Sequence, residues 1–173
     1  ADGGTKLEQW MPGELLFDNA VNNARLAART SEIVGVLWHQ GESDCAKELY
    51  PTYQQRFEVI MTALRKELDL HNVPFILGGL GDFLKFCIKD EKLINYIHVN
   101  NALKNTATSN EMTGFVSAKG LGSNPDNMHF SAKSLREFGV RYYEEFLKHE
   151  DKNKAFLEKA TPDAAIRNEI ESL

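Results

Sequence analysis

The sequence predicts an α/β fold in which helices cover both faces of a parallel sheet. Short apolar runs suited to buried parallel strands recur along the chain, and longer amphipathic stretches separate them. The chain has 173 residues, a length typical of one globular domain. We therefore expect a single three-layer α/β/α domain.

Three strands are predicted, at 33–38, 74–79 and 114–118. The first two are almost entirely apolar, as expected for strands buried on both faces, and the third is weaker. Because a sheet usually has about five or six strands, we expect that N-terminal strands are missing from this chain. The opening Gly3-Gly4-Thr5 supports this expectation, since such turns follow a strand and introduce a helix.

Apolar residues at helical spacing predict covering helices at 15–29, 53–68, 93–103 and 131–146. In the last helix, five residues are expected to be able to face the sheet: Leu135, Phe138, Val140, Tyr142 and Phe146. The chain then becomes highly charged. We expect residues 1–149 to form the domain and residues 150–173 to form a charged helical appendage.

Composition excludes several classes of protein. No apolar run approaches the roughly 18–20 residues needed to cross a bilayer, so no membrane span is expected. A net charge of −5 with scattered basic residues argues against nucleic acid as a partner. Two cysteines and five dispersed histidines predict neither a disulfide framework nor a metal site, and no cofactor is expected. Without a visible export signal, we expect a cytoplasmic location.

The strongest local signal is the heptapeptide W-H-Q-G-E-S-D at 38–44, which follows a predicted buried strand and precedes a helix. Ligand sites of α/β folds lie at such positions, beyond the carboxyl ends of parallel strands. The Gln40 amide can donate to a developing oxyanion, and Glu42 can orient neighbours or accept from a substrate hydroxyl. The alternative is a polar turn in which Ser43 or Asp44 caps the next helix.

A second signal is the D-x-x-H pattern formed by Asp126 and His129 after the third predicted strand. A carboxylate that accepts from one imidazole nitrogen fixes the tautomer and leaves the other nitrogen free as a general base. The alternative is an Asx-turn at Asp126 beside an ordinary histidine. Because both motifs follow predicted strands, we expect their loops to share one rim of the sheet.

The two motifs together resemble a known family. With G-G-T upstream and Phe130-Ser131 after the D-x-x-H, they resemble the sialic-acid-specific acetylesterase and acetylxylan esterase group, carbohydrate esterase family six, within the SGNH hydrolases. The similarity spans about residues 3–146, and G-G-L-G-D-F-L at 78–84 is similar to acetylxylan-esterase-related proteins. It implies a flavodoxin-like fold and a metal-free Ser-His-Asp esterase acting on acetylated carbohydrates.

By the same resemblance, Asp126 and His129 match the acid and base, Gln40 an oxyanion glutamine, and Glu42 a carboxylate of the signature. The family's serine lies in a G-Q-S-N motif that this sequence lacks. We therefore expect the nucleophile to lie outside this chain and the isolated chain to be nearly inactive. An exposed edge of the first predicted strand would then pair with a complementing N-terminal segment or with another copy.

Two other interpretations compete with this one. In the first, Ser43 is the nucleophile of an elbow-like turn, with Cys45 in place of the last glycine of G-x-S-x-G. In the second, the chain is a non-catalytic carbohydrate-binding or assembly protein, with Trp10 and Trp38 as stacking surfaces for sugars. For each tryptophan, the simpler interpretation as core or loop packing is the favoured one.

Overall fold

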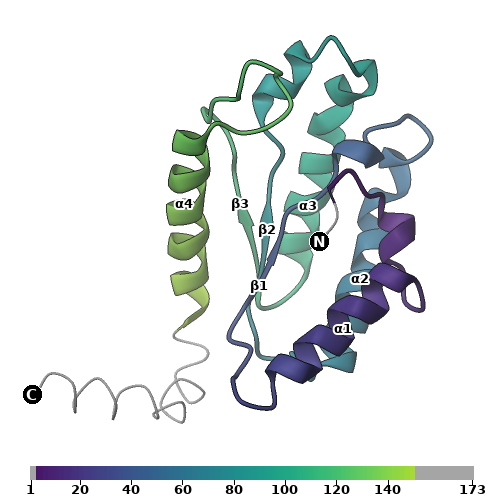
Figure 1. Ribbon diagram of the computed structural model, residues 1–173, viewed down its shortest axis with the longest axis vertical. Helices are drawn as coiled ribbons and strands as arrows, with labels where there is room; N and C mark the ends of the chain where they lie inside the picture. The colour runs from purple at the N-terminus through teal and green to yellow at the C-terminus, as the bar shows by residue number, and fades with distance from the viewer. Residues whose placement is uncertain (1–2, 151–173) are drawn as a thin grey trace, which may run out of the picture.

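The computed structural model describes residues 3–150 as a three-layer α/β/α arrangement (Figure 1). The sheet has three parallel strands in the order β1 (Val36–Trp38), β2 (Phe75–Gly78) and β3 (Thr113–Val116). The predicted fold class is confirmed. Each strand lies within or close to its predicted range but is only three or four residues long.

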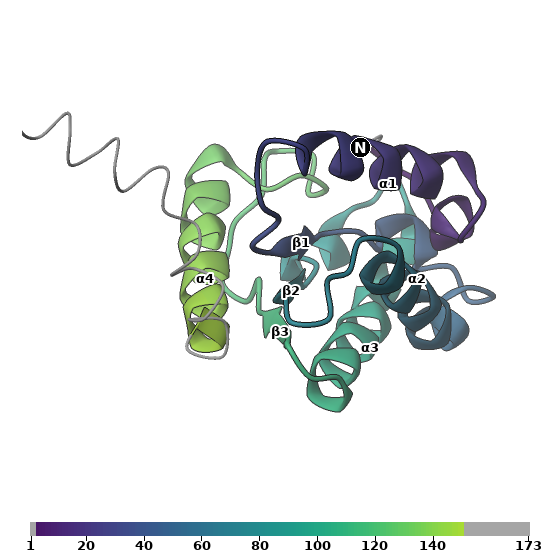
Figure 2. The ribbon, with the colours of Figure 1, turned by 90° about the horizontal axis from the view of Figure 1, so that it is seen from below.

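Helices cover both faces of this sheet. Figure 2 shows α4 (Ala132–Glu150) on one face and α1 (Leu15–Ala27), α2 (Tyr53–Glu67) and α3 (Tyr96–Ser109) on the other. No helix within residues 3–150 is long and apolar enough to cross a membrane.

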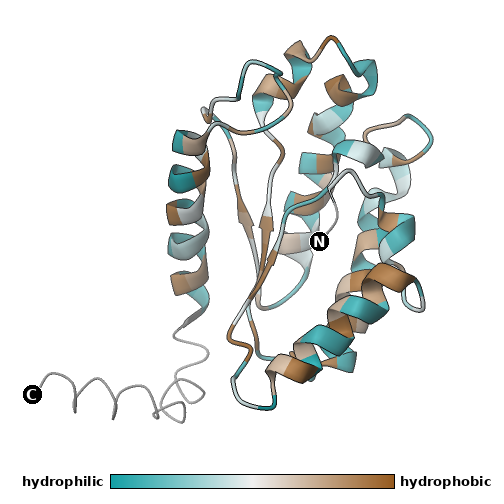
Figure 3. Cartoon of the chain, in the orientation of Figure 1, coloured by the Kyte–Doolittle hydropathy of each residue, from teal (hydrophilic) through white to brown (hydrophobic). Residues whose placement is uncertain are grey.

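Each face has its own hydrophobic core, because successive strand residues point to opposite sides of a sheet. In β2, Phe75 and Leu77 join the larger core under the first three helices, whereas Ile76 joins Phe138 and Tyr142 of α4. Figure 3 shows the consequence: the strands are mainly hydrophobic, while the helices carry hydrophobic and hydrophilic residues together. Both faces of the sheet are therefore buried at β2.

Two details of the helices differ from the sequence-based expectation. A 3-10 helix (Glu91–Asn95) takes up the start of the third predicted helix, and α3 begins at Tyr96 and continues to Ser109. Its second half is rich in Thr and Asn, which weakens the apolar pattern although Thr106 is fully buried. In α4, Leu135 and Val140 are exposed, because Ser134, Phe138 and Tyr142 set the buried stripe. The proposed appendage at 150–173 lies outside the described residues, apart from the last residue of α4.

The hydroxyl of Tyr142 ties α4 to the sheet. It donates to the Trp38 carbonyl at the end of β1, at 3.0 Å. Gly78 lies directly beneath it, and a Cβ on Gly78 would be only 1.7 Å from the Tyr142 oxygen. The absence of a side chain at Gly78 is thus what lets α4 approach the ends of β1 and β2.

We predict that Gly78→Ala lowers the free energy of unfolding by about 1–3 kcal/mol, the usual cost of overpacking a core. Gly139→Ala in α4 is the matched control, because its Cβ meets nothing within 4 Å and alanine favours a helix by about 1 kcal/mol. Chemical denaturation measures both variants. The clash would be the wrong explanation if Gly78→Ala cost as much stability beside Tyr142→Leu, which removes both the hydroxyl and the ring Cζ that the new Cβ would meet, as it does beside Tyr142.

Candidate active site

The segments that follow the three strands meet at the carboxyl end of the sheet and enclose a cavity of about 300 Å³. Residues 39–43 after β1, residues 90–93 after β2 and residues 128–129 after β3 contribute to its wall. Gly3, Gly4 and Thr5 complete it. The structure therefore brings the heptapeptide and the D-x-x-H motif, which are 82 residues or more apart in sequence, to one site.

Asp126 holds both the turn and the ring of His129. Its Oδ1 accepts from the backbone amides of Met128 at 2.9 Å and His129 at 3.1 Å. Its Oδ2 lies 2.7 Å from Nδ1 of the His129 ring. The two interpretations of the motif are thus both realised, since an Asx-type turn and a carboxylate–imidazole pair use different oxygens of one side chain.

This pairing determines the charge of Asp126 and the position of the hydrogen on the His129 ring. The hydrogen bond with the His129 ring, helped by the two backbone amides, holds the pKa of Asp126 well below its usual range. An ionised Asp126 keeps hydrogen on Nδ1 of His129 and leaves Nε2 free to accept a proton. His129 lines the cavity and its side chain is 71% exposed, so a reacting group can reach it.

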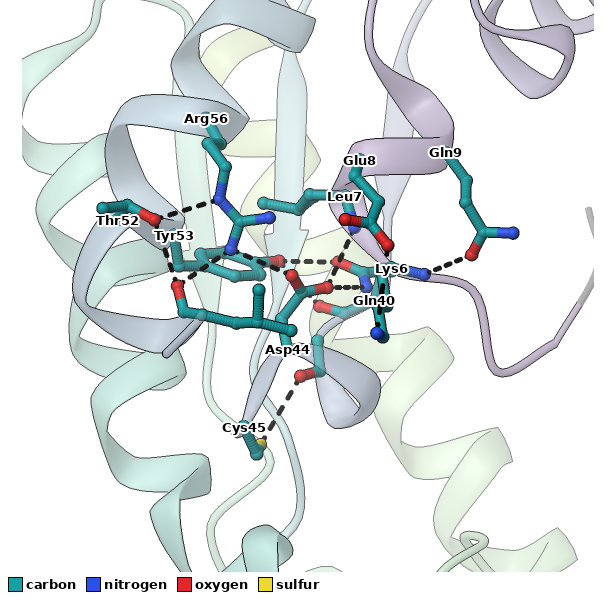
Figure 4. A network of polar contacts seen from close by, with 12 residues as sticks. Lys6, Leu7, Glu8, Gln9, Gln40, Asp44, Cys45, Thr52, Tyr53 and Arg56 are labelled. Carbon is teal, nitrogen blue, oxygen red and sulfur yellow. Dashed lines mark hydrogen bonds and ion pairs between the residues drawn. The ribbon is translucent and has the colours of Figure 1, made fainter. Parts of the chain in front are cut away.

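The turn after β1 is built around the fully buried carboxylate of Asp44 (Figure 4). Its Oδ2 accepts from the Leu7 backbone amide at 2.9 Å and from the Gln40 side-chain amide at 2.7 Å. Its Oδ1 lies 3.0 Å from Arg56 of α2. One carboxylate therefore joins the N-terminal segment, the turn and α2.

The Gln40 side chain is held at both ends. Its amide nitrogen donates to Asp44 and also to the Thr5 carbonyl at 2.8 Å, and its amide oxygen lies 3.1 Å from the Tyr53 hydroxyl. Both amide hydrogens are thus directed at protein acceptors. The oxyanion role expected of Gln40 stays a prediction, and in this arrangement the residue positions Thr5 at the cavity wall.

Glu42 faces the cavity without being part of that network. Its Oε1 lies 3.8 Å from Nε2 of His39, and each of the two side chains is 35% exposed. The His39 ring packs edge-on against Phe130 and Phe138. Burial lowers the pKa of His39, an effect opposed by the Glu42 carboxylate.

The turn offers two further candidate nucleophiles, and both are engaged. The Ser43 hydroxyl donates to the Gly4 carbonyl at 2.7 Å, so its hydrogen points to a backbone oxygen rather than to a histidine. Burial, with the nearby carboxylates of Glu42 and Asp44, raises the pKa of the Cys45 thiol to about 12. The hydrogen bond to Gly4 argues against Ser43 as the nucleophile of an elbow-like turn, and the raised pKa argues against a thiolate at Cys45.

Trp38 does not offer a stacking surface to sugars. It is buried and packs against Trp10, with ring centroids 5.5 Å apart, and against Phe57 at 5.0 Å. A larger cavity of about 630 Å³ lies beside the first and shares Lys92 with it, but it is not lined by the Asp126–His129 pair. Within residues 3–150, no three His, Cys, Asp or Glu side chains gather as a metal-binding group.

A family comparison fits this geometry. The family model described as "Carbohydrate esterase, sialic acid-specific acetylesterase" matches residues 1–148. The chain belongs to this family of carbohydrate esterases. The match includes the heptapeptide, the D-x-x-H turn and every described element except the end of α4.

An Arabidopsis thaliana protein extends the comparison. Curated as a probable carbohydrate esterase, it is 26% identical to this chain over 156 residues, which are 85% of this chain. The chain spans about half of that relative's length (53%). The X-ray structure of the Arabidopsis protein matches with a TM-score of 0.71 at 24% identity, covering 84% of this chain and 58% of the other. This likeness shows that the two share a fold.

Sequence reasoning singled out Gln40, Glu42, Asp126 and His129, all at this site of the carbohydrate esterase domain. It missed the role of Asp44, which it considered only as a helix cap, and it missed Arg56. The available signal was a charged residue on α2 directly before the core residue Phe57. Spacing alone does not show that such a charge pairs with a carboxylate twelve residues earlier.

We predict that Asp44→Asn lowers the free energy of unfolding by about 3 kcal/mol, because it leaves Arg56 without its buried partner. Hydrogen exchange at the Leu7 amide should also become faster, since the charged acceptor of that amide is lost. Glu67→Gln is the control: it removes an exposed ion pair with Arg25 and should cost under about 1 kcal/mol. Chemical denaturation measures both variants, and an equal loss of unfolding free energy in the two would contradict the central role of Asp44.

The Asp126–His129 pair predicts a pH dependence. Because the pKa of Asp126 is lower in the folded than in the unfolded protein, where it is about 3.9, ionisation stabilises the fold above that pH. This contribution is lost as the pH falls through the lower folded-state pKa. Carbon-13 NMR of the Asp126 carboxyl should show no titration near pH 4, and His129→Ala should raise its pKa toward that value. A midpoint unaffected by His129→Ala would contradict the pairing.

Proposed function

We propose that this carbohydrate esterase chain supplies the acid and base of an O-acetylesterase that removes acetyl groups from sugars. The observation that carries the proposal is the Asp126–His129 pair, with 2.7 Å between carboxylate and ring, beside a cavity of about 300 Å³ that His129 lines. The family match gives the carbohydrate esterase class. We propose in addition that the ester is an acetyl ester, that the alcohol is a sugar hydroxyl and that the nucleophile is a serine.

In the proposed mechanism, a serine attacks the carbonyl carbon of the acetyl ester. His129 Nε2 removes the serine proton, and the ionised Asp126 stabilises the imidazolium that forms. His129 then returns the proton to the departing sugar oxygen, which leaves an acetyl-serine. Water, deprotonated by the same nitrogen, releases acetate and restores the serine.

We place this serine outside the 173 residues. The sequence contains no G-Q-S-N motif, and Ser43 donates its hydrogen to Gly4. Edge strand β1, which pairs only with β2 among the described strands, offers backbone groups to which a further strand can bind. The proposed serine therefore comes from a complementing segment that pairs at β1.

The proposal predicts almost no hydrolysis of 4-nitrophenyl acetate by the 173-residue chain alone. Adding a separately produced segment that carries G-Q-S-N should raise turnover by orders of magnitude, since a complete triad is worth about 10⁶ in subtilisin. His129→Ala should abolish the gain, whereas Ser43→Ala should retain it. The proton release that accompanies acetate formation measures each combination.

Two outcomes would contradict this account. Vigorous hydrolysis by the chain alone that His129→Ala abolishes would show that the nucleophile lies within these residues. Loss of the gain in Ser43→Ala, together with loss of labelling by a serine-reactive phosphonate, would identify Ser43 as that nucleophile.

A further inference from the structure

His39 is a histidine of the cavity that the proposed mechanism does not use. It directly follows β1, and its ring is fixed edge-on between Phe130 at 5.7 Å and Phe138 at 5.6 Å. These two aromatic residues belong to the loop before α4 and to α4 itself. His39 thus has a defined orientation and cannot swing toward His129 without leaving its packing.

The contacts of the ring distinguish its two nitrogens. Nδ1 lies on the side of Gly78, 2.9 Å from the position that a Cβ would occupy there, so it faces the backbone at the end of β2. Nε2 lies on the side of Glu42. A neutral ring that carries its hydrogen on Nδ1, toward this backbone, is left with a lone pair on Nε2. Burial, which lowers the pKa of His39, favours this neutral form.

Nε2 of His39 and the Glu42 carboxylate are therefore two acceptors on one wall of the cavity. The 3.8 Å between them is too long for a direct hydrogen bond. Both side chains remain one-third exposed, so a ligand can reach them. Two adjacent acceptors favour a ligand with two adjacent donors, and neighbouring sugar hydroxyls are such donors. A carboxylate at this wall also disfavours an anionic group at the same position.

We propose that His39 and Glu42 recognise two neighbouring free hydroxyl groups of the sugar, with one acceptor for each hydroxyl. The inference rests on the proposed function and deepens it, because it makes the pair a determinant of specificity. The preferred substrate is a sugar that is acetylated at one position and carries free hydroxyls beside it. A fully acetylated sugar leaves both acceptors unpaired in the complex, which weakens binding.

Binding to the full 173-residue chain tests this without requiring turnover. We compare methyl 2-O-acetyl-β-D-xylopyranoside, which has two free neighbouring hydroxyls, with the tri-O-acetyl derivative, which has none. NMR titration of the nitrogen-15-labelled chain should show at least about tenfold tighter binding of the mono-acetyl sugar. The Nε2 resonance of His39 should shift with that sugar only, a response that a purely structural histidine would not give.

Variants test whether His39 and Glu42 cause the preference for the mono-acetyl sugar. His39→Phe keeps an aromatic ring against Phe130 and Phe138 but removes both nitrogens, and it should reduce the tenfold preference several-fold, because Glu42 still accepts from one hydroxyl. Glu42→Gln, at a partly exposed position, should reduce it several-fold and provides the test if His39→Phe does not fold. His98→Phe is the matched control, since His98 is exposed, stacks on Tyr50 and does not line the cavity.

Equal binding of the two sugars to the wild-type chain, or no binding of either, would overturn the inference. A preference that survives both His39→Phe and Glu42→Gln would overturn it as well. The esterase proposal is judged separately, by the His129-dependent hydrolysis that the chain shows when the segment carrying G-Q-S-N is added. Loss of the hydroxyl preference with retained His129-dependent hydrolysis is therefore a failure of this inference alone.

Discussion

The buried carboxylate of Asp44 is the interaction on which the geometry of the cavity depends. A charged group without solvent is stable only when its oxygens have partners, and Asp44 finds them in Leu7, Gln40 and Arg56. These partners come from the N-terminal segment, the turn after β1 and α2. Because Asp44 needs all three partners, it holds the N-terminal segment against the turn after β1. Gln40 and Ser43 of that turn then donate to the Thr5 and Gly4 carbonyls, which fixes both residues at the cavity.

The part of the cavity wall that His129 forms is set by packing rather than by charge. Phe130, which follows His129, contacts the rings of Phe83, Phe138 and His39. This aromatic cluster rests on α4, whose approach to the sheet requires the missing side chain of Gly78. The position of the His129 turn thus depends on the same close contact that holds α4 against β1 and β2.

Three carboxylates near the cavity have different environments and therefore different capacities. Asp44 is fully buried against Arg56 and joins the N-terminal segment to the turn after β1 and to α2. Asp126 accepts two backbone amides and the ring of His129, which keeps it ionised beside a base. Glu42 is partly exposed and faces His39 across 3.8 Å, an arrangement suited to a ligand. Residue type alone does not distinguish these roles, since the environment of each carboxylate determines them.

The sequence by itself determined the fold class, because apolar runs and helical spacing follow directly from which faces are buried. It also determined the family, through the heptapeptide and the D-x-x-H turn, and the local Asp126–His129 pair, whose members are three residues apart. Only the tertiary structure decided the partners of Asp44, the engagement of both Gln40 amide hydrogens and the orientation of His39. Those contacts join residues up to 99 positions apart in sequence, as between His39 and Phe138, and a spacing pattern carries no information on which distant groups meet.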